Sequence, residues 1–141
     1  MIVDANPVVT ACLGLSKPLF RDVIASGWDL FVPEHQLREV RLVTARLAEH
    51  RKVDLRTALA WVDATLTAVP SRTYAGYERE ARARFEAIND KDWPLVALAL
   101  ATGDDVWSND VDLFGTGIAV WNTHNIRRMA LAGRQHGNND A

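Results

Sequence analysis

Short runs of apolar residues alternate along this chain with longer segments in which apolar residues recur every three or four positions. The short runs predict buried strands, because a strand covered on both faces carries apolar side chains at consecutive positions. The longer segments predict amphipathic helices. Four runs are strand candidates, and the more polar segment 71–74 is a fifth: Ile2–Val3, 30–32, 71–74, 106–108 and 118–121. This alternation predicts an α/β fold with a central parallel sheet of about five strands, flanked by helices on both faces.

Helix boundaries are marked by residues that start or stop a helix. Asp92, Trp93 and Pro94 open the most apolar helix, because proline is favoured in a first helical turn, and Gly103 ends it. The last predicted helix covers residues 126–131, and the end of the chain is polar. We expect one domain over residues 1–130 and a flexible C-terminal tail over residues 131–141.

Composition restricts the class of protein further. The 141 residues are 48% hydrophobic and 24% charged, as in ordinary globular domains. The single cysteine, Cys12, excludes an internal disulfide. The longest strongly apolar run, 95–101, is far shorter than the ~20 residues that span a bilayer, and no secretory signal is visible. We therefore expect a cytoplasmic protein that does not bind a membrane.

Four acidic residues fall at or near the ends of predicted elements. Asp4 directly follows the first strand, and Asp110 comes just after the fourth. Asp92 precedes the apolar helix, and Glu39 lies one turn into the helix after the second strand. Ligands of open parallel sheets bind at the carboxyl ends of the strands, so the four side chains can converge there. Simpler interpretations also exist: Asp92 and Asp110 as helix caps, and Glu39 as an ordinary surface residue.

Carboxylates gathered at one edge of a sheet repel one another, by about 4 kcal/mol for a pair ~4 Å apart. Either some of them carry protons or a cation neutralises them. Hard oxygen donors, with no cysteine and histidine pairs at metal-binding spacing, favour Mg²⁺ or Mn²⁺ over zinc. A metal ion held in this way beside a phosphate can make hydroxide and stabilise the leaving oxygen.

Basic residues are concentrated in and after the helix that follows the second predicted strand, although the net charge is −2. Arg38, Arg41 and Arg46 belong to this group. One interpretation is a solvated helix face. The other is a phosphate-binding stripe, since a planar guanidinium pairs two phosphate oxygens at once. In the second interpretation these three side chains bind the backbone of RNA.

The sequence resembles the PIN domain family at four places in the right order. These are Met-Ile-Val-Asp-Ala-Asn at residues 1–6, Glu39 in a helix, Asp-Lys-Asp-Trp-Pro-Leu-Val-Ala-Leu-Ala-Leu at residues 90–100, and Trp-Ser-Asn-Asp-Val-Asp-Leu-Phe at residues 107–114. The resemblance covers about residues 1–125 and is greatest to the small toxin-type members, the ribonucleases of VapBC toxin–antitoxin pairs. It implies a five-stranded parallel sheet, Mg²⁺-dependent cleavage of RNA phosphodiesters, a homodimer, and a cognate antitoxin protein that reaches the acidic pocket.

The resemblance also implies roles for individual residues. Asp4, Glu39, Asp92 and Asp110 would be the catalytic acids, with Asp4, Asp92 and Asp110 binding the metal. The same motifs supply five supporting residues: Asn6, Asp90, Ser108, Asn109 and Asp112. Ser108 would hold the carboxylates in place by hydrogen bonding, and Asp112 would support or share the metal. Asp90 competes with Asp92 for the third position, and we prefer Asp92 because it caps the apolar helix directly.

Other functions are compatible with parts of this pattern. A housekeeping RNA-processing PIN nuclease carries the same acids, and a catalytically inactive PIN fold can act as a protein-binding module. A phosphatase with an aspartate nucleophile is disfavoured, because residues 4–6 lack the second aspartate that such a mechanism uses for acid catalysis. A receiver-type signalling domain is disfavoured because residues 71–74 contain no aspartate and no lysine follows Lys91.

Overall fold

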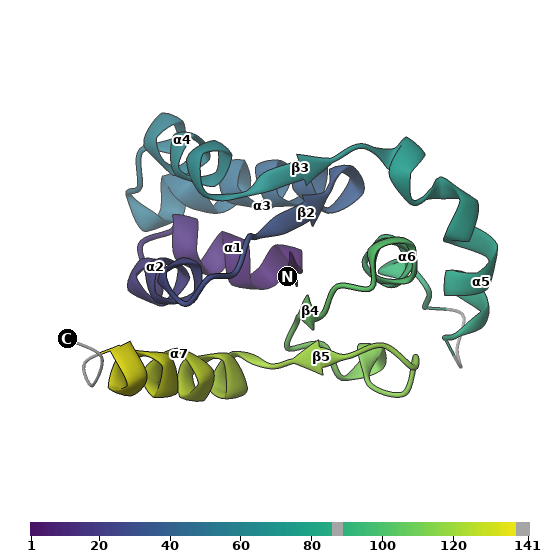
Figure 1. Ribbon diagram of the computed structural model, residues 1–141. Helices are drawn as coiled ribbons and strands as arrows, with labels where there is room; N and C mark the ends of the chain where they lie inside the picture. The colour runs from purple at the N-terminus through teal and green to yellow at the C-terminus, as the bar shows by residue number, and fades with distance from the viewer. Residues whose placement is uncertain (86–88, 138–141) are drawn as a thin grey trace.

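The computed structural model describes residues 1–85 and 89–137, and its strands form one five-stranded sheet (Figure 1). The strands are β1 (Ile2–Val3), β2 (Phe31–Pro33), β3 (Thr67–Val69), β4 (Val106–Trp107) and β5 (Val120–Trp121). Their order across the sheet is β3-β2-β1-β4-β5, and every neighbouring pair is parallel. The predicted α/β fold with a five-stranded parallel sheet is confirmed.

Helices cover both faces of this sheet (Figure 1). On one side of the column of strands lie α1 (Ala5–Cys12), α2 (Lys17–Ala25), α3 (Glu34–Arg51), α4 (Leu55–Thr65) and α7 (Thr123–Gly137). On the other side lie α5 (Glu78–Ala83) and α6 (Trp93–Thr102). Short 3-10 turns join these elements: η1 (Ser71–Thr73), η2 (Ala75–Tyr77) and η3 (Val111–Leu113). Within the described residues, no helix is both long and apolar enough to span a bilayer.

Successive residues of a strand point to opposite faces, and this divides the core into two layers. Val3 of β1 packs with Val32 and Trp107 in the layer covered by α1 to α4 and α7. Its neighbour Ile2 packs with Val106 in the layer covered by α6. Because helices cover both faces, the central strands are short and entirely apolar.

The ends of α6 follow directly from its sequence. Pro94 lies in the first turn, where its missing amide proton costs nothing. Gly103 ends the helix in the left-handed conformation, with φ 76°, which glycine adopts without strain. The helix then returns to β4, so α6 runs antiparallel to the strands and begins at the carboxyl edge of the sheet. Asp92, the residue before α6, is thereby placed at that edge.

The third strand is not where the sequence predicted it. β3 covers Thr67–Val69, whereas residues 71–73 form η1. β3 lies at the edge of the sheet beside β2, and its first two residues are exposed. It therefore lacks the apolar run that marks the inner strands. Pro70 follows it and cannot donate a backbone hydrogen bond to continue the ladder.

The last helix is longer than predicted. α7 covers Thr123–Gly137, so the expected tail is helical from residue 131 to residue 137. Ile126 and Ala130 are buried in the core, and Arg134, one turn further, forms an ion pair with Asp22 of α2. The polar composition that suggested a tail belongs in part to the outer face of this helix. Residues 138–141 of the expected tail lie outside the described residues.

β1 is the central strand of the sheet, and later strands are added first on one side of it and then on the other. The connections after β1 lead first to β2 and β3 on one side, and later to β4 and β5 on the other. A crevice outside the carboxyl end of such a strand is the usual ligand site of an open α/β sheet. Asp4 is the first residue after β1 and stands at this point.

Candidate active site

Asp4 is held at the carboxyl ends of two neighbouring strands. Its backbone amide donates to the carbonyl of Trp107 at the end of β4 (2.9 Å). The residue is 7% exposed, and its carboxylate accepts hydrogen bonds from the amide of Ala5 (2.7 Å) and the hydroxyl of Ser108 (2.6 Å). Burial raises the pKa of Asp4, the two hydrogen bonds lower it, and the charges of Glu39 and Asp110 raise it again. The net result is a carboxyl group whose pKa lies above its ordinary value.

Ser108 connects Asp4 to the loop that carries Asp110. This serine is fully buried, and its hydroxyl donates to Asp4 Oδ2 while accepting from the amide of Asp110 (3.0 Å). Asp110 itself begins η3, where its Oδ1 accepts from the amide of Asp112 (3.0 Å). The side chain of Asp110 therefore caps a turn and also lies close enough to Asp4 to affect its pKa.

Asp92 completes a group of three neighbouring carboxyl side chains. It is 8% exposed, and its Oδ1 accepts a hydrogen bond from Gln36 Nε2 of α3 (3.2 Å). Burial, the charge of Asp4 and hydrogen bonding with Asp110 raise the pKa of Asp92 from 3.8 to about 7, although the Gln36 contact lowers it. The structure thus brings Asp4, Asp92 and Asp110 together from three separate parts of the chain.

The position of Asp92 has a different cause from the one that the sequence suggested. Asp92 occupies the capping position of α6, but within the described residues its side chain makes no capping hydrogen bond. The carboxylate points instead to Gln36. Asp90, the competing acid, forms an ion pair with Arg82 of α5 (3.0 Å), and its carbonyl accepts from the amide of Trp93. Of the two acids, it is Asp92 that joins Asp4 and Asp110.

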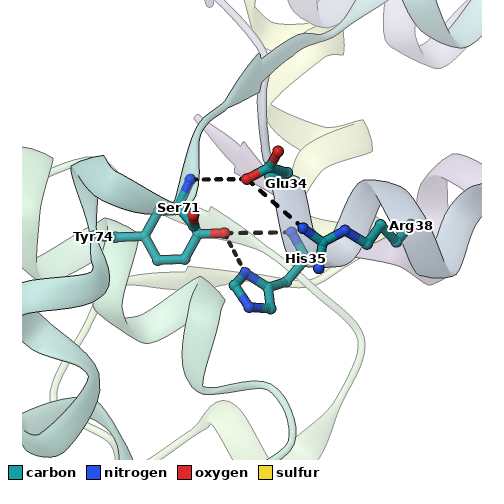
Figure 2. Close-up of polar contacts among 5 residues, drawn as sticks. All are labelled: Glu34, His35, Arg38, Ser71 and Tyr74. Carbon is teal, nitrogen blue, oxygen red and sulfur yellow. Dashed lines mark hydrogen bonds and ion pairs between the residues drawn. The ribbon is translucent and has the colours of Figure 1, made fainter.

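Glu39 lies on α3 beside this group. Its side chain is exposed, and its charge raises the pKa of Asp4. The first turn of α3 is anchored to the η1–η2 segment, as Figure 2 shows. Glu34 Oε2 accepts from the amide of Ser71 (3.1 Å), and the buried Tyr74 hydroxyl accepts from the amide of His35 (3.3 Å) and lies 2.6 Å from His35 Nδ1. These contacts fix the helix turn from which Glu39 and Gln36 extend.

The other predicted supporting residues lie at the margin of the acidic group. Asn6 is exposed on α1. Asn109 is also exposed, and it binds the start of α7 through two hydrogen bonds of 2.8 Å with Thr123. Asp112 is exposed and lines a pocket of about 270 Å³ with residues that follow α5, such as Arg84 and Phe85, and with Val111 of η3. In the described structure, the contact of Asp112 with Asp110 is through its backbone amide.

The three arginines proposed for RNA lie on the exposed side of α3. Arg38 pairs with Glu34 (3.9 Å), and Arg41 pairs with Asp63 of α4 (3.3 Å). Arg46 is exposed as well. Exposed ion pairs contribute only about 0–1 kcal/mol, so phosphate groups can compete with these carboxylates for the arginines.

A divalent cation fits the chemistry of the acidic group. Among the described residues, no three acidic, histidine or cysteine side chains stand in positions that would hold one metal ion without rearrangement. However, Asp4 and Asp92 are buried, and each is destabilised as an anion by neighbouring carboxylates. A cation would remove that penalty, and carboxylate oxygens are the donors that Mg²⁺ and Mn²⁺ prefer.

The sequence profile of the PIN domain matches residues 2–130, from β1 into α7. The chain belongs to the PIN domain family. PIN domains are generally metal-dependent nucleases, so this fold is a nuclease fold whose expected substrate is nucleic acid. No curated protein matches the chain. All four predicted acids fall inside the region matched as a PIN domain.

Sequence reasoning missed Gln36 of this PIN domain. The buried positions of α3 begin at Gln36 and continue with Val40, Thr44 and Ala48. These four residues are four apart, so a polar side chain in phase with a buried stripe was the available signal. A buried glutamine needs hydrogen-bond partners, and one of them is the acidic group.

Proposed function

We propose that this PIN domain is a Mg²⁺- or Mn²⁺-dependent endoribonuclease and the toxin of a type II toxin–antitoxin pair. The convergence of Asp4, Asp92 and Asp110 at the carboxyl edge of the sheet is the observation that supports the nuclease activity most directly. Three acids whose carboxyl groups lose stability when ionised together are stabilised as anions by a cation, and a cation in turn attracts a phosphodiester.

In this proposal Asp4, Asp92 and Asp110 would hold the cation, which would supply Lewis acidity for an attacking water and for the leaving oxygen. Ser108 keeps the Asp4 carboxylate oriented through its 2.6 Å hydrogen bond. Glu39, exposed beside Asp4, would steer the cation from the rim of the site. Arg38, Arg41 and Arg46 bind the RNA backbone on the outer side of α3.

The change Asp4→Asn tests the nuclease activity. Asparagine keeps the size of the side chain and an acceptor for the Ala5 amide but removes the charge, so cleavage of RNA in Mg²⁺ falls more than about 100-fold, beyond the effect usual for outer partners of a metal. Asp29→Asn is the matched control, because Asp29 is an exposed aspartate before β2, at the amino end of the strands. Undiminished cleavage by a folded Asp4→Asn protein would show that the proposed chemistry is wrong.

The toxin role needs its own experiments. Expression of the wild-type chain is expected to arrest growth, expression of Asp4→Asn is not, and the product of a small neighbouring gene is expected to neutralise the active protein. An arginine from that antitoxin would suit the acidic group by charge. Growth that continues despite active enzyme would favour a housekeeping nuclease, and a folded wild type that neither cleaves RNA nor binds metal would favour a protein-binding module. Light scattering of the purified chain tests the homodimer.

A further inference from the structure

Gln36 is a polar side chain buried against the acidic group. It is 3% exposed, and it extends from the first turns of α3 toward the start of α6. Its Nε2 donates to Asp92 Oδ1 at 3.2 Å. Its Oε1 has no hydrogen-bond partner. Among the described residues, every other buried side-chain oxygen or nitrogen atom has one. Buried polar atoms are nearly always hydrogen-bonded, so this oxygen needs an explanation.

Rotation of the amide does not supply a partner. When Asp92 is ionised, as a bound cation requires, exchanging the amide oxygen and nitrogen would place Oε1 3.2 Å from a carboxylate oxygen, where two acceptors face each other. The ionised carboxylate therefore selects the nitrogen, and the oxygen is left without a partner. The contacts of Glu34 and His35 with η1 and η2 (Figure 2) hold the same helix turn in place, so α3 is not free to withdraw the side chain.

A neutral oxygen is well suited to this position. Asp4, Asp92 and Asp110 together bring up to three negative charges to a cation that carries two. Another carboxylate would increase their repulsion, whereas an amide carbonyl offers an oxygen donor without adding charge. Amide carbonyls of glutamine and asparagine are ordinary partners of hard divalent cations and of the water that such cations retain.

We propose that Gln36 is a positioning residue of the cation site, which orients Asp92 through Nε2 and offers Oε1 to the bound cation or to one of its waters. This inference rests on the proposed function, because it requires that the acidic group bind Mg²⁺ or Mn²⁺. It assigns a role to a residue outside the four acids. The unpaired oxygen is explained because its partner arrives with the cation.

The test compares Mn²⁺ binding by wild type and three variants. Binding is measured by isothermal titration calorimetry and by the electron paramagnetic resonance signal of Mn²⁺. Gln36→Met keeps the side chain similar in length and removes both polar atoms, and its Mn²⁺ affinity is expected to fall by about 10- to 100-fold, as for other outer partners of metal ligands. Gln36→Glu keeps an oxygen at the same reach but loses the donor to Asp92 and adds a charge, so its Mn²⁺ affinity is expected to exceed that of Gln36→Met without reaching that of wild type. Thr44→Val is the control, because Thr44 is a buried polar residue on the same helix whose hydroxyl contacts Cys12 instead.

The outcomes separate this inference from the proposed function. If wild type binds Mn²⁺ and cleaves RNA while Gln36→Met binds Mn²⁺ equally well, Gln36 is a structural residue and the inference is wrong, although the nuclease stands. If Gln36→Glu binds Mn²⁺ no better than Gln36→Met, an oxygen at this position does not contribute and the role given to Oε1 is wrong. If wild type binds no Mn²⁺, both the inference and the proposed function fail. Gln36→Asn, whose oxygen falls short by one methylene, replaces Gln36→Met if the latter does not fold.

Discussion

Without a divalent cation, this protein should lose stability as the pH rises toward neutrality, and Asp92 is the main cause. In the unfolded chain its carboxyl group loses its proton near the ordinary pKa of 3.8, whereas in the folded protein the pKa is about 7. Between these two values the folded state holds a proton that the unfolded state lacks. Stability therefore decreases with rising pH over this interval and levels off above it.

The size of the effect follows from the interval between the two pKa values. One pH unit corresponds to about 1.4 kcal/mol, so the change from 3.8 to about 7 amounts to about 4 kcal/mol as an upper value. That is a large part of the ~5–15 kcal/mol by which domains are stable. Asp4, whose pKa is also raised, adds to the effect, while Asp54, whose pKa is lowered by hydrogen bonds from Thr57, opposes it at lower pH.

Comparison with Asp92→Asn isolates the contribution of this one carboxyl group. Asparagine keeps the size of the side chain and an oxygen for Gln36, but it cannot ionise. We expect the free energy of unfolding of Asp92→Asn to exceed that of wild type by an amount that grows by about 1.4 kcal/mol per pH unit up to about pH 7. At about pH 8 this difference should reach up to about 4 kcal/mol. Urea unfolding followed by tryptophan fluorescence, with a chelator present, measures this difference between about pH 5 and pH 8.

A difference between the two proteins that stays constant with pH would refute the reasoning, because it would mean that Asp92 has the same pKa in the folded and unfolded states. Asp29→Asn again serves as the control for the loss of one negative charge away from the acidic group. Addition of Mg²⁺ at about pH 8 should stabilise wild type by mass action and leave Asp92→Asn nearly unchanged. The variant is then more stable and less active, because the charge repulsion that it relieves is part of the proposed cation site.

Two further changes probe the same edge of the sheet. Ser108→Ala removes the donor to Asp4 and the acceptor for the Asp110 amide. The free energy of unfolding should therefore fall by about 1–3 kcal/mol, and RNA cleavage should fall with it; an unchanged midpoint of urea unfolding would contradict this. Asp90→Asn weakens a partly exposed ion pair with Arg82, so we expect a loss of at most about 1 kcal/mol with cleavage retained, and a loss of cleavage equal to that of Asp92→Asn would show that Asp90 belongs to the site.

The central strands that the sequence predicted correctly are buried on both faces, and the half-buried edge strand β5 was found as well because it is also apolar. β1 and β4 consist of apolar residues because helices cover both of their faces. Each strand therefore appears in the sequence as a short apolar run, which predicts a buried strand. β3 has one neighbour within the sheet and exposes Thr67 and Ala68, so its pairing with β2 rather than its composition makes it a strand. α7 was underestimated for a similar reason, because its stability comes from Ile126 and Ala130 packing on the core.

The acids at the ends of strands followed from topology, since Asp4 and Asp110 come directly after strands that must end at the same edge. Their electrostatic state could not be predicted, because it depends on burial and on distances between side chains from separate elements. The environment of Asp92 depends on Gln36 of α3, and that of Asp90 depends on Arg82 of α5. No spacing within the sequence relates these partners.

The hydrogen bond between Asp4 and Ser108 joins residues that are 104 positions apart. During translation, the growing polypeptide therefore displays Asp4 long before the ribosome has added Ser108 and Asp110. Until β4 docks beside β1, Asp4 lacks the hydroxyl that orients it and the carboxyl groups that surround it. An incomplete translation product that stops before β4 thus carries Asp4 and Asp92 without Ser108 and Asp110, so the three-acid group cannot assemble until β4 and the residues after it have been added.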